Sequence, residues 1–535
     1  MQKNKIYAFL LCIQILVSCA QIVSPTGGNK DEEHPIVIET IPPNQSVNFN
    51  SNEIKINFNE YIELKNPDKI IFSPPLKEKP TLDYKGKQLT VSIKNKELDS
   101  NSTYSINLSG SITDIHEGLP LKNYTYSFSK SSHIDEDSLL GRVIDGFNAK
   151  NLKDYTVALY DTSGFNDSIP FKTTPKFYSL SNDSGYFNIH NLPKRYFKLF
   201  CYNDLNKNSK FDNNEDYGFI EDPIAISTNK SLILRVNKPD LYAKNKILDA
   251  NKIGSNTYAL PIYQPEKIVI KKLNEIGAKS NTIFKEGNNE IDTFFYATEE
   301  IFNDSVVSMI VNKNNTVSDT VTILNFKKIK NKKPVLSYSS IIRFDDTVKI
   351  NLNTPCKKID KNRIKILVDS TELAYNIIDE SAILFSVVFK KEEGKLYKIQ
   401  VKDSAFLSFD GEFNSNKIAE IKTYSSNQSG EIKLNIINLN QVPVIISLVT
   451  NNDKEEEIYR ILNDKNTESS IKYCNPGEYK IKIVLDTNKN KKWDKGNWIK
   501  KSIPEPVFYL KELIGVRILW EIEQTINIDD IVPKQ

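Results

Sequence analysis

The sequence predicts an all-β protein made of several β-sandwich domains in series. Apolar and polar residues alternate over many short stretches, as at Ile54, Ile56 and Phe58, and this two-residue period is typical of half-buried strands. Turn residues such as Pro42-Pro43-Asn44 separate these stretches. Domains usually hold about 100–150 residues, so a chain of 535 residues is expected to form four or five of them. Because 39% of the residues are apolar, each domain can bury its own core.

The first residues have the pattern of a targeting segment. Lys3 and Lys5 give a basic start, and residues 6–17 form an apolar run that is too short to span a bilayer. The run ends in Leu16-Val17-Ser18-Cys19, with small residues on both sides of the cysteine. A plain secretory signal with a coincidental cysteine and an uncleaved N-terminal anchor are the alternative interpretations.

This ending resembles the lipobox of bacterial lipoproteins. The resemblance implies a signal peptide over residues 1–18, cleavage before Cys19 and acylation of the Cys19 thiol. Residues 24–31 are rich in Gly, Pro, Ser and Thr, which predicts a flexible tether over residues 19–33. Within it, residues 24–31 have the pattern SPTGG-x-KD, which resembles the stretch after the lipidated cysteine in lipoproteins of Bacteroidetes-type bacteria.

The first domain is expected over residues 34–130. Its repeated short strands and turns are typical of a β-sandwich. Four motifs within it are Thr40-Ile41-Pro42-Pro43-Asn44, Asn59-Glu60-Tyr61, Asn101-Ser102-Thr103-Tyr104 and Asp114-Ile115-His116-Glu117-Gly118. With these motifs the segment resembles the bacterial Ig-like domain of the S-layer SbsA type.

The second domain is expected over residues 137–239. It carries Gly141-Arg142-Val143-Ile144-Asp145, the apolar strand pattern of residues 155–160 and the turn Asn182-Asp183-Ser184-Gly185. This order resembles the prealbumin-like sandwich of surface proteins and of carboxypeptidase regulatory domains. The resemblance implies a fold and no peptidase activity.

The second half of the chain repeats the first half. A β-rich spacer domain is expected over residues 240–330, which contain no informative motif. Residues 333–427 then repeat the Ig-like pattern, residues 428–525 repeat the prealbumin-like pattern, and residues 526–535 form a tail.

A loop rich in acids and amides occurs in both prealbumin-like segments. Its spacing, D-x-N-x-N-x-x-x-D, places side-chain oxygens at loop positions 1, 3, 5 and 9, and calcium takes six to eight oxygen ligands. Position 12 is Glu215 in the first loop and Asn497 in the second. The candidate metal ligands are Asp204, Asn206, Asn208, Asp212 and Glu215, and then Asp486, Asn488, Asn490 and Asp494.

A metal-free turn is the competing interpretation of both loops. Neither loop has Gly at position 6, where Ser209 and Lys491 stand, and both loops follow strands and contain several lysines. Asn and Asp also form turns without any metal. We therefore expect any calcium site to be weak, and we expect no other cofactor.

Charge and motifs limit the classes of function. Lys and Arg total 71 against 68 for Asp and Glu, and the dense basic run of Lys327, Lys328, Lys330, Lys332 and Lys333 falls where a linker is expected, so we predict no nucleic-acid partner. The four histidines stand in no catalytic motif, and G-x-S-x-G, H-E-x-x-H and a phosphate loop are all missing, so we predict no enzyme. Cys201, Cys356 and Cys474 are far apart, and whether two of them pair stays open.

The expected function is a cell-envelope lipoprotein that acts as a multi-domain scaffold or binding protein. A membrane reached through the lipid anchor is the expected partner, with envelope proteins or glycans as further candidates. The residues after Cys19 lack an acidic run, which favours the periplasmic face of the outer membrane over the surface face. The alternatives are a glycan-binding lipoprotein of an uptake system, with Trp493, Trp498 and Trp520 near its ligand face, and a hydrolase without a recognisable motif.

Overall fold

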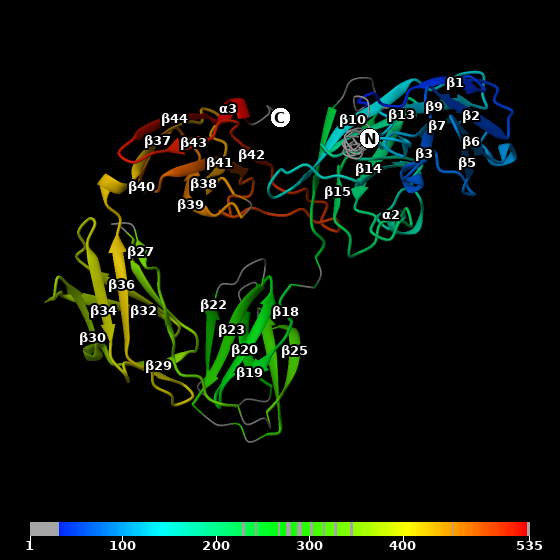
Figure 1. Ribbon diagram of the computed structural model, residues 1–535. Coiled ribbons are helices and arrows are strands. Elements are labelled where there is room, and N and C mark those ends of the chain that lie inside the picture. Colours follow the sequence, from blue (N-terminus) through cyan, green and yellow to red (C-terminus); the bar gives the residue numbers. More distant parts are fainter. Residues whose placement is uncertain are drawn as a thin grey trace, which may run out of the picture. The chain divides into compact units, whose positions relative to one another are not determined.

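The regular secondary structure of the computed structural model is almost entirely short strands, most of which pair antiparallel (Figure 1). In its described part, no helix has more than four residues, and none is long and apolar enough to cross a membrane. The residues that the structure describes are 31–122, 124–226, 231–240, 242, 244–265, 268–273, 280–285, 291–299, 302, 304–313, 316–325, 329–342, 346–452 and 454–531. Cys19 and the predicted signal and tether up to residue 30 lie outside these ranges, as do Lys327 and Lys328.

The first sandwich has a four-stranded sheet in the order β1-β2-β6-β5, a three-stranded sheet β4-β7-β9 and the pair β3-β8. Ile54, Ile56 and Phe58 on β2 point into its core, and burying one such side chain stabilises the fold by about 1.5–3 kcal/mol. Its elements are β1 (Val37–Ile41), β2 (Glu53–Phe58), β3 (Ile62–Leu64), η1 (Pro67–Lys69), β4 (Ile71–Ser73), β5 (Thr81–Lys85), β6 (Gln88–Ser92), η2 (Asn95–Glu97), β7 (Thr103–Asn107), β8 (Ile112–Asp114) and β9 (Thr125–Ser129).

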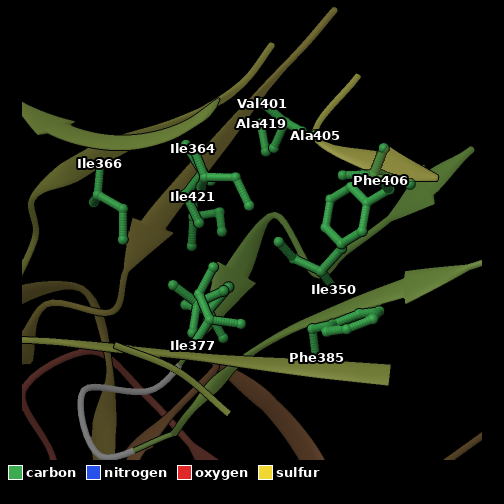
Figure 2. Packing of buried hydrophobic residues seen from close by; sticks show 14 of the residues in the cluster. Ile350, Ile364, Ile366, Ile377, Phe385, Val401, Ala405, Phe406, Ala419 and Ile421 are labelled. Carbon is green, nitrogen blue, oxygen red and sulfur yellow. The ribbon is translucent and has the colours of Figure 1, made fainter. Parts of the chain in front are cut away.

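The fourth sandwich repeats the first. Its sheets run β26-β28-β33-β32 and β27-β36-β34-β30-β31, with the pair β29-β35, so each sheet of the first sandwich has a counterpart. Figure 2 shows its core, where Ile350, Phe385 and Phe406 pack together. The elements are β26 (Leu336–Ser337), β27 (Ile341–Ile342), β28 (Val348–Leu352), β29 (Cys356–Ile359), η3 (Lys361–Arg363), β30 (Ile364–Val368), β31 (Thr371–Glu372), β32 (Tyr375–Ser381), β33 (Leu384–Phe389), β34 (Leu396–Val401), β35 (Phe406–Ser408), β36 (Lys417–Thr423) and η4 (Ser426–Gln428).

The second sandwich packs the sheet β13-β10-β17 against the sheet β12-β11-β14-β15, in which β16 also pairs with β14. Leu139, Val157 and Leu199 are among the residues of its core. Its elements are β10 (Asp137–Asp145), β11 (Thr156–Asp161), α2 (Ile169–Lys172), β12 (Phe177–Leu180), β13 (Tyr186–Leu192), β14 (Tyr196–Tyr202), β15 (Tyr217–Phe219), β16 (Ile224–Ala225) and β17 (Ser231–Val236).

The fifth sandwich repeats the second strand for strand. Its sheets run β40-β37-β44 and β39-β38-β41-β42, and β43 pairs with β41 as β16 pairs with β14. This correspondence confirms the repeat that the sequence predicts. The elements are β37 (Gly430–Ile437), β38 (Val444–Thr450), β39 (Glu457–Asn463), β40 (Thr467–Cys474), β41 (Gly477–Leu485), β42 (Val507–Tyr509), β43 (Ile514–Val516), β44 (Glu521–Asn527) and α3 (Ile528–Ile531).

The third sandwich has no counterpart among the others. The sheets β18-β20-β23-β22 and β21-β24-β25 enclose a core that includes Tyr258, Tyr296 and Met309, and β19 pairs with β20. Its elements are β18 (Lys246–Ile247), β19 (Asn251–Lys252), β20 (Thr257–Tyr263), β21 (Ile268–Lys272), β22 (Ser280–Lys285), β23 (Ile291–Thr298), β24 (Val306–Lys313) and β25 (Thr316–Leu324).

The chain divides into two compact units. The first is made of residues up to Ile144, Lys150–Asp212 and Tyr217–Val236, and the second of Asp145–Ala149, Asn213–Asp216 and Asn237 onward. The domain boundaries drawn from the sequence, near 34, 135, 240, 333 and 428, stay a prediction.

A buried carboxylate joins the third and fourth sandwiches within the second unit. Asp410, 8% exposed, accepts hydrogen bonds from the Asn256 amide N–H at 2.6 Å and from the Thr257 hydroxyl at 3.0 Å. The approach is so close that a Cβ on Gly254 would lie 2.0 Å from a carboxylate oxygen of Asp410. Asn331, from the predicted linker, donates to the Asp410 carbonyl at 2.9 Å. This part of the linker is therefore held at the junction through Asn331, while Lys330, Lys332 and Lys333 beside it are exposed.

Asp410→Ala is expected to loosen this junction. It removes the acceptor of two buried donors, which costs about 1–3 kcal/mol. We expect faster trypsin cleavage after Lys330, Lys332 or Lys333 in the full chain, followed by mass spectrometry. Glu420→Ala, on the exposed side of β36, is the control and should cleave like the wild type. Equal cleavage of all three chains would contradict a joining role for Asp410.

Candidate functional site

Both predicted metal loops are ordered, and they have the same backbone geometry. In the first loop, Asp204 accepts hydrogen bonds from the amide N–H groups of Asn208 and Ser209, at 3.0 and 2.8 Å. In the second loop, Asp486 accepts from Asn490 and Lys491, both at 2.9 Å. The first aspartate of each loop therefore organises the turn that follows it.

The fourth and sixth residues of both loops have a left-handed backbone. The φ angles are +57° at Lys207 and +58° at Ser209 in the first loop, and +58° at Lys489 and +68° at Lys491 in the second. Such angles favour Gly and cost a residue with a side chain about 1–2 kcal/mol. The missing Gly at position 6 therefore does not prevent the turn, although it makes the turn more costly.

The amides of each loop converge on its last aspartate. The side-chain N–H groups of Asn206 and Asn208 donate to one carboxylate oxygen of Asp212, at 2.7 and 2.9 Å. Asn488 and Asn490 make the same contacts with Asp494. Calcium binding would require both amides of a loop to rotate, so that their oxygens face the site.

The residue at position 12 of the second loop does not face the loop. Asn497 stands there in the sequence, but its backbone pairs with Ser502 in a separate turn. A buried residue further along, Glu505, faces the loop and accepts hydrogen bonds from the amide N–H groups of Thr487 at 2.7 Å and Asp494 at 3.1 Å. Glu505 lies 19 residues after Asp486, too far along the chain for the loop spacing to include it, and its position between Pro504 and Pro506 is the available signal in the sequence. In the first loop, Glu215 is buried and falls in the segment Asn213–Asp216 of the second compact unit.

Aromatic residues attach both loops to the outer face of a sheet. Phe211 packs against Phe171 and Phe200, with ring centroids 4.7 and 5.0 Å apart. Trp493 packs on a small apolar cluster that includes Val484, and its indole N–H donates to the Glu505 carbonyl at 3.0 Å. Because these rings bury the outer sheet face, Trp493 is an anchor of the loop and does not offer its ring face as a glycan platform.

A third candidate lies in the first sandwich, where two of the Ig-like motifs meet. β3 pairs with β8, which brings Glu60 close to Asp114. Burial raises the pKa of Glu60, and the Asp114 carboxylate raises it further. Within the described ranges, one group of metal-ligating side chains lies within 4.8 Å of one another, and it consists of Asp114, His116 and Glu117.

Backbone groups already use the Asp114 carboxylate. It is 2% exposed, and it accepts four amide N–H groups, those of residues 116–118 on one oxygen and that of Leu119 on the other. Burial raises the pKa of Asp114, but the four hydrogen bonds together outweigh burial, so the pKa lies below its usual value. Asp114 thus holds the loop after β8 in place, which is a structural role.

The other titratable residues noted in the sequence are dispersed. His34 contacts the Pro120 carbonyl at 2.8 Å, His133 contacts the Ser131 hydroxyl at 3.2 Å, and His190 is partly buried with a pKa lowered by desolvation. Cys201, Cys356 and Cys474 are buried and are not joined in disulfides, and desolvation raises the pKa of Cys356 to about 11.

Comparison with known proteins supports the Ig-like part of the fold. Residues 31–130 match the family described as bacterial Ig-like domain. No curated protein matches the chain. Among solved structures, BcpA, the major pilin subunit of Bacillus cereus, is similar at 12% identity and a TM-score of 0.14, covering 73% of this chain and 99% of that one. The I9–I11 tandem of titin is similar at 6% identity and a TM-score of 0.12, covering 52% and 99%.

The observed fold and the match of residues 31–130 to the bacterial Ig-like domain family define the class of protein. The chain is a multi-domain protein of Ig-like and related β-sandwich domains, with two domain types each present twice. The SbsA subtype and the Bacteroidetes-type origin stay resemblances.

Asp114→Asn is expected to destabilise the first sandwich at neutral pH. The amide would place its NH₂ against the Leu119 N–H, at a cost of about 1–3 kcal/mol. A lowered folded pKa gives stability that is present above the unfolded pKa of about 3.9 and is lost as the pH falls through the folded pKa. The difference between the two chains should therefore shrink below about pH 4. Hydrogen exchange of the peptide that spans residues 112–121 measures it.

Asp83→Asn, at an exposed position of β5, is the matched control and should leave that peptide's protection unchanged at every pH. A difference between Asp114→Asn and wild type that does not change with pH would show that the Asp114 charge is not responsible.

Calcium binding by the two loops stays a prediction. If the loops bind calcium, millimolar calcium should slow hydrogen exchange in residues 204–212 and 486–494 of the full chain, relative to chelator, because a ligand that binds only the folded form stabilises it. Asp204→Ala/Asp212→Ala should remove the effect in the first loop alone, and Asp486→Ala/Asp494→Ala in the second alone. Asp222→Ala/Asp249→Ala, at exposed positions outside both loops, is the control. Unchanged exchange in wild type would leave both loops as hydrogen-bonded turns.

Proposed function

We propose that this protein is a non-catalytic lipoprotein of the bacterial cell envelope, tethered through Cys19, in which serial β-sandwiches act as a scaffold or binding protein. The observation that supports this proposal most directly is the repetition of domains. The described part of the chain forms five successive β-sandwiches, each with its own hydrophobic core, and two sandwich topologies each occur twice. Repetition of whole domains extends a chain in steps and provides separate surfaces for partners, which suits a scaffold.

The state of the potential catalytic groups supports a non-catalytic role. Nucleophilic catalysis by cysteine needs an accessible thiolate, whereas Cys356 is buried and its pKa is raised to about 11. A general base must reach the proton that it abstracts, whereas the Asp114 carboxylate already accepts four backbone hydrogen bonds. Both groups therefore favour the scaffold over the alternative of a hydrolase.

The tryptophans favour the scaffold over a glycan-binding protein of an uptake system. Trp493 is partly buried against the cluster that includes Val484, and its indole N–H donates to the Glu505 carbonyl. A cationic group occupies one ring face of each of the other two, with Lys501 Nζ 3.3 Å from the Trp498 ring centroid and the Arg517 guanidinium 4.7 Å from that of Trp520, which is 52% exposed. Envelope proteins are the partners that this proposal favours.

The proposed location is the periplasmic face of the outer membrane. The lipobox-like Leu16-Val17-Ser18-Cys19 supports the anchor, and the uncharged residues Ala20–Val23 support the periplasmic face over the surface face. Several acyl chains on one cysteine hold a protein firmly, because each buried methylene contributes about 0.8 kcal/mol.

Cys19→Ala is expected to release the protein from the membrane, because it removes the thiol that would be acylated. Fractionation of cells should find wild type with the outer membrane, and the variant either soluble or as a larger, unprocessed precursor. Cys12→Ala, within the apolar run, is the control and should fractionate like the wild type. A mature-sized Cys19→Ala band in the outer membrane would refute the lipoprotein proposal.

A further inference from the structure

The second loop continues into a short, fixed turn at residues 497–502. Asn497 and Ser502 close its base, with the Asn497 N–H donating to the Ser502 carbonyl at 2.7 Å and the Ser502 N–H donating back at 3.1 Å. The Lys500 N–H donates to the Asn497 side-chain oxygen at 2.9 Å, and Lys501 has a φ of +56°. These bonds fix the conformation in which the four residues of the tip, 498–501, are displayed.

The tip exposes an apolar side chain. Ile499 is 86% exposed, the highest value among the exposed large apolar side chains of the described residues. Trp498 stands beside it, with the Lys501 ammonium over its ring at 3.3 Å. Nearby Ile503 is 52% exposed. A single exposed Ile is ordinary, but an Ile beside Trp and Lys on an ordered tip has the composition of a membrane-interface anchor.

Lysines surround this tip. Residues 486–502 contain six lysines and two aspartates. The aspartates face inward, because Asp486 accepts two loop amides and Asp494 accepts the side-chain amides of Asn488 and Asn490. Lys489, Lys491, Lys492 and Lys500 are exposed. The solvent-facing charge of this segment is therefore positive.

The fold itself does not require this charge. The first loop has the same backbone geometry, yet residues 204–217 contain two lysines and four acids and carry no Trp-Ile-Lys-Lys tip. The first loop exposes Leu205 and Lys207, whereas the second loop exposes four lysines beside Ile499 and Trp498.

We propose that residues 498–501 are a membrane-docking tip that places Ile499 and Trp498 among the headgroups of an anionic bilayer while the surrounding lysines contact lipid phosphates. Charge complementarity selects an anionic surface, because each Lys near such a surface strengthens binding. The solvent-facing Ile499 favours a lipid surface over a nucleic acid, because a nucleic-acid backbone has no apolar layer that the side chain can enter. This contact would be independent of the acyl anchor, so it can fail while the proposed function stands.

Vesicle binding tests the tip. The chain from Ala20 onward lacks the signal and the acylated cysteine, and it should co-sediment with vesicles of equal phosphatidylglycerol and phosphatidylcholine but not with phosphatidylcholine alone. Lys500→Glu/Lys501→Glu should lower the partition coefficient at least about tenfold, because two attractive charges become repulsive. Ile499→Ser should also lower it severalfold, because the apolar contact is lost. The tryptophan emission should shift to the blue on binding, and Trp498→Phe should remove that shift.

Lys349→Glu/Lys422→Glu, at two exposed strand positions of the fourth sandwich, makes the same change in net charge and should bind like the wild type. Circular dichroism of every variant confirms that it is folded. Failure of the wild type to bind anionic vesicles would overturn the proposal. So would equal loss in the control variant, since the effect would then be net charge alone. If Ile499→Ser and Trp498→Phe bind anionic vesicles as tightly as the wild type, the contact is purely electrostatic. That result would also overturn the proposal that the two side chains insert among the headgroups.

Discussion

The structure depends on one constraint, which is that each short strand carries an apolar face that must be covered by a second sheet. β28 shows it most simply, since Val348, Ile350 and Leu352 are buried and the residues between them are exposed. A lone sheet of such strands would leave that face in water, so the chain builds two-layered sandwiches one after another. Each sandwich is closed within its own stretch of sequence, which makes it possible to repeat domains.

The same constraint explains where the two acidic loops lie. Sheets such as β12-β11-β14-β15 are apolar on both faces, and β11 is buried from Thr156 to Tyr160. The second sheet of the sandwich covers only the inner face, so other side chains must bury the apolar outer face. Phe211 and Trp493 do so from within the loops, so each loop has a packing role that is independent of any metal. Asp204 and Asp486 then satisfy the backbone groups of the turn that carries each ring.

The repeated domains have diverged where packing leaves the side chains free. The loop geometry is kept in both copies, while the number of lysines differs, with two in residues 204–217 and six in residues 486–502. Buried polar contacts differ as well: Asp114 binds the backbone of its own turn, whereas Asp410 in the fourth sandwich binds the third. Duplication thus kept the cores and changed the surfaces, which is how a scaffold can acquire distinct contacts along one chain.

The sequence by itself determined the all-β class, the paired repeat and the position of both loops, because a two-residue period and turn chemistry act locally. Ile54, Ile56 and Phe58, and likewise Tyr397, Ile399 and Val401, lie on buried strand faces as their spacing predicts. Only the tertiary structure decided that Glu505 rather than Asn497 faces the second loop, that Asn331 is held by Asp410, and that Trp493 is an anchor. Each of these contacts joins residues that are distant in the sequence, and their pairing depends on how whole strands pack, which no local pattern encodes.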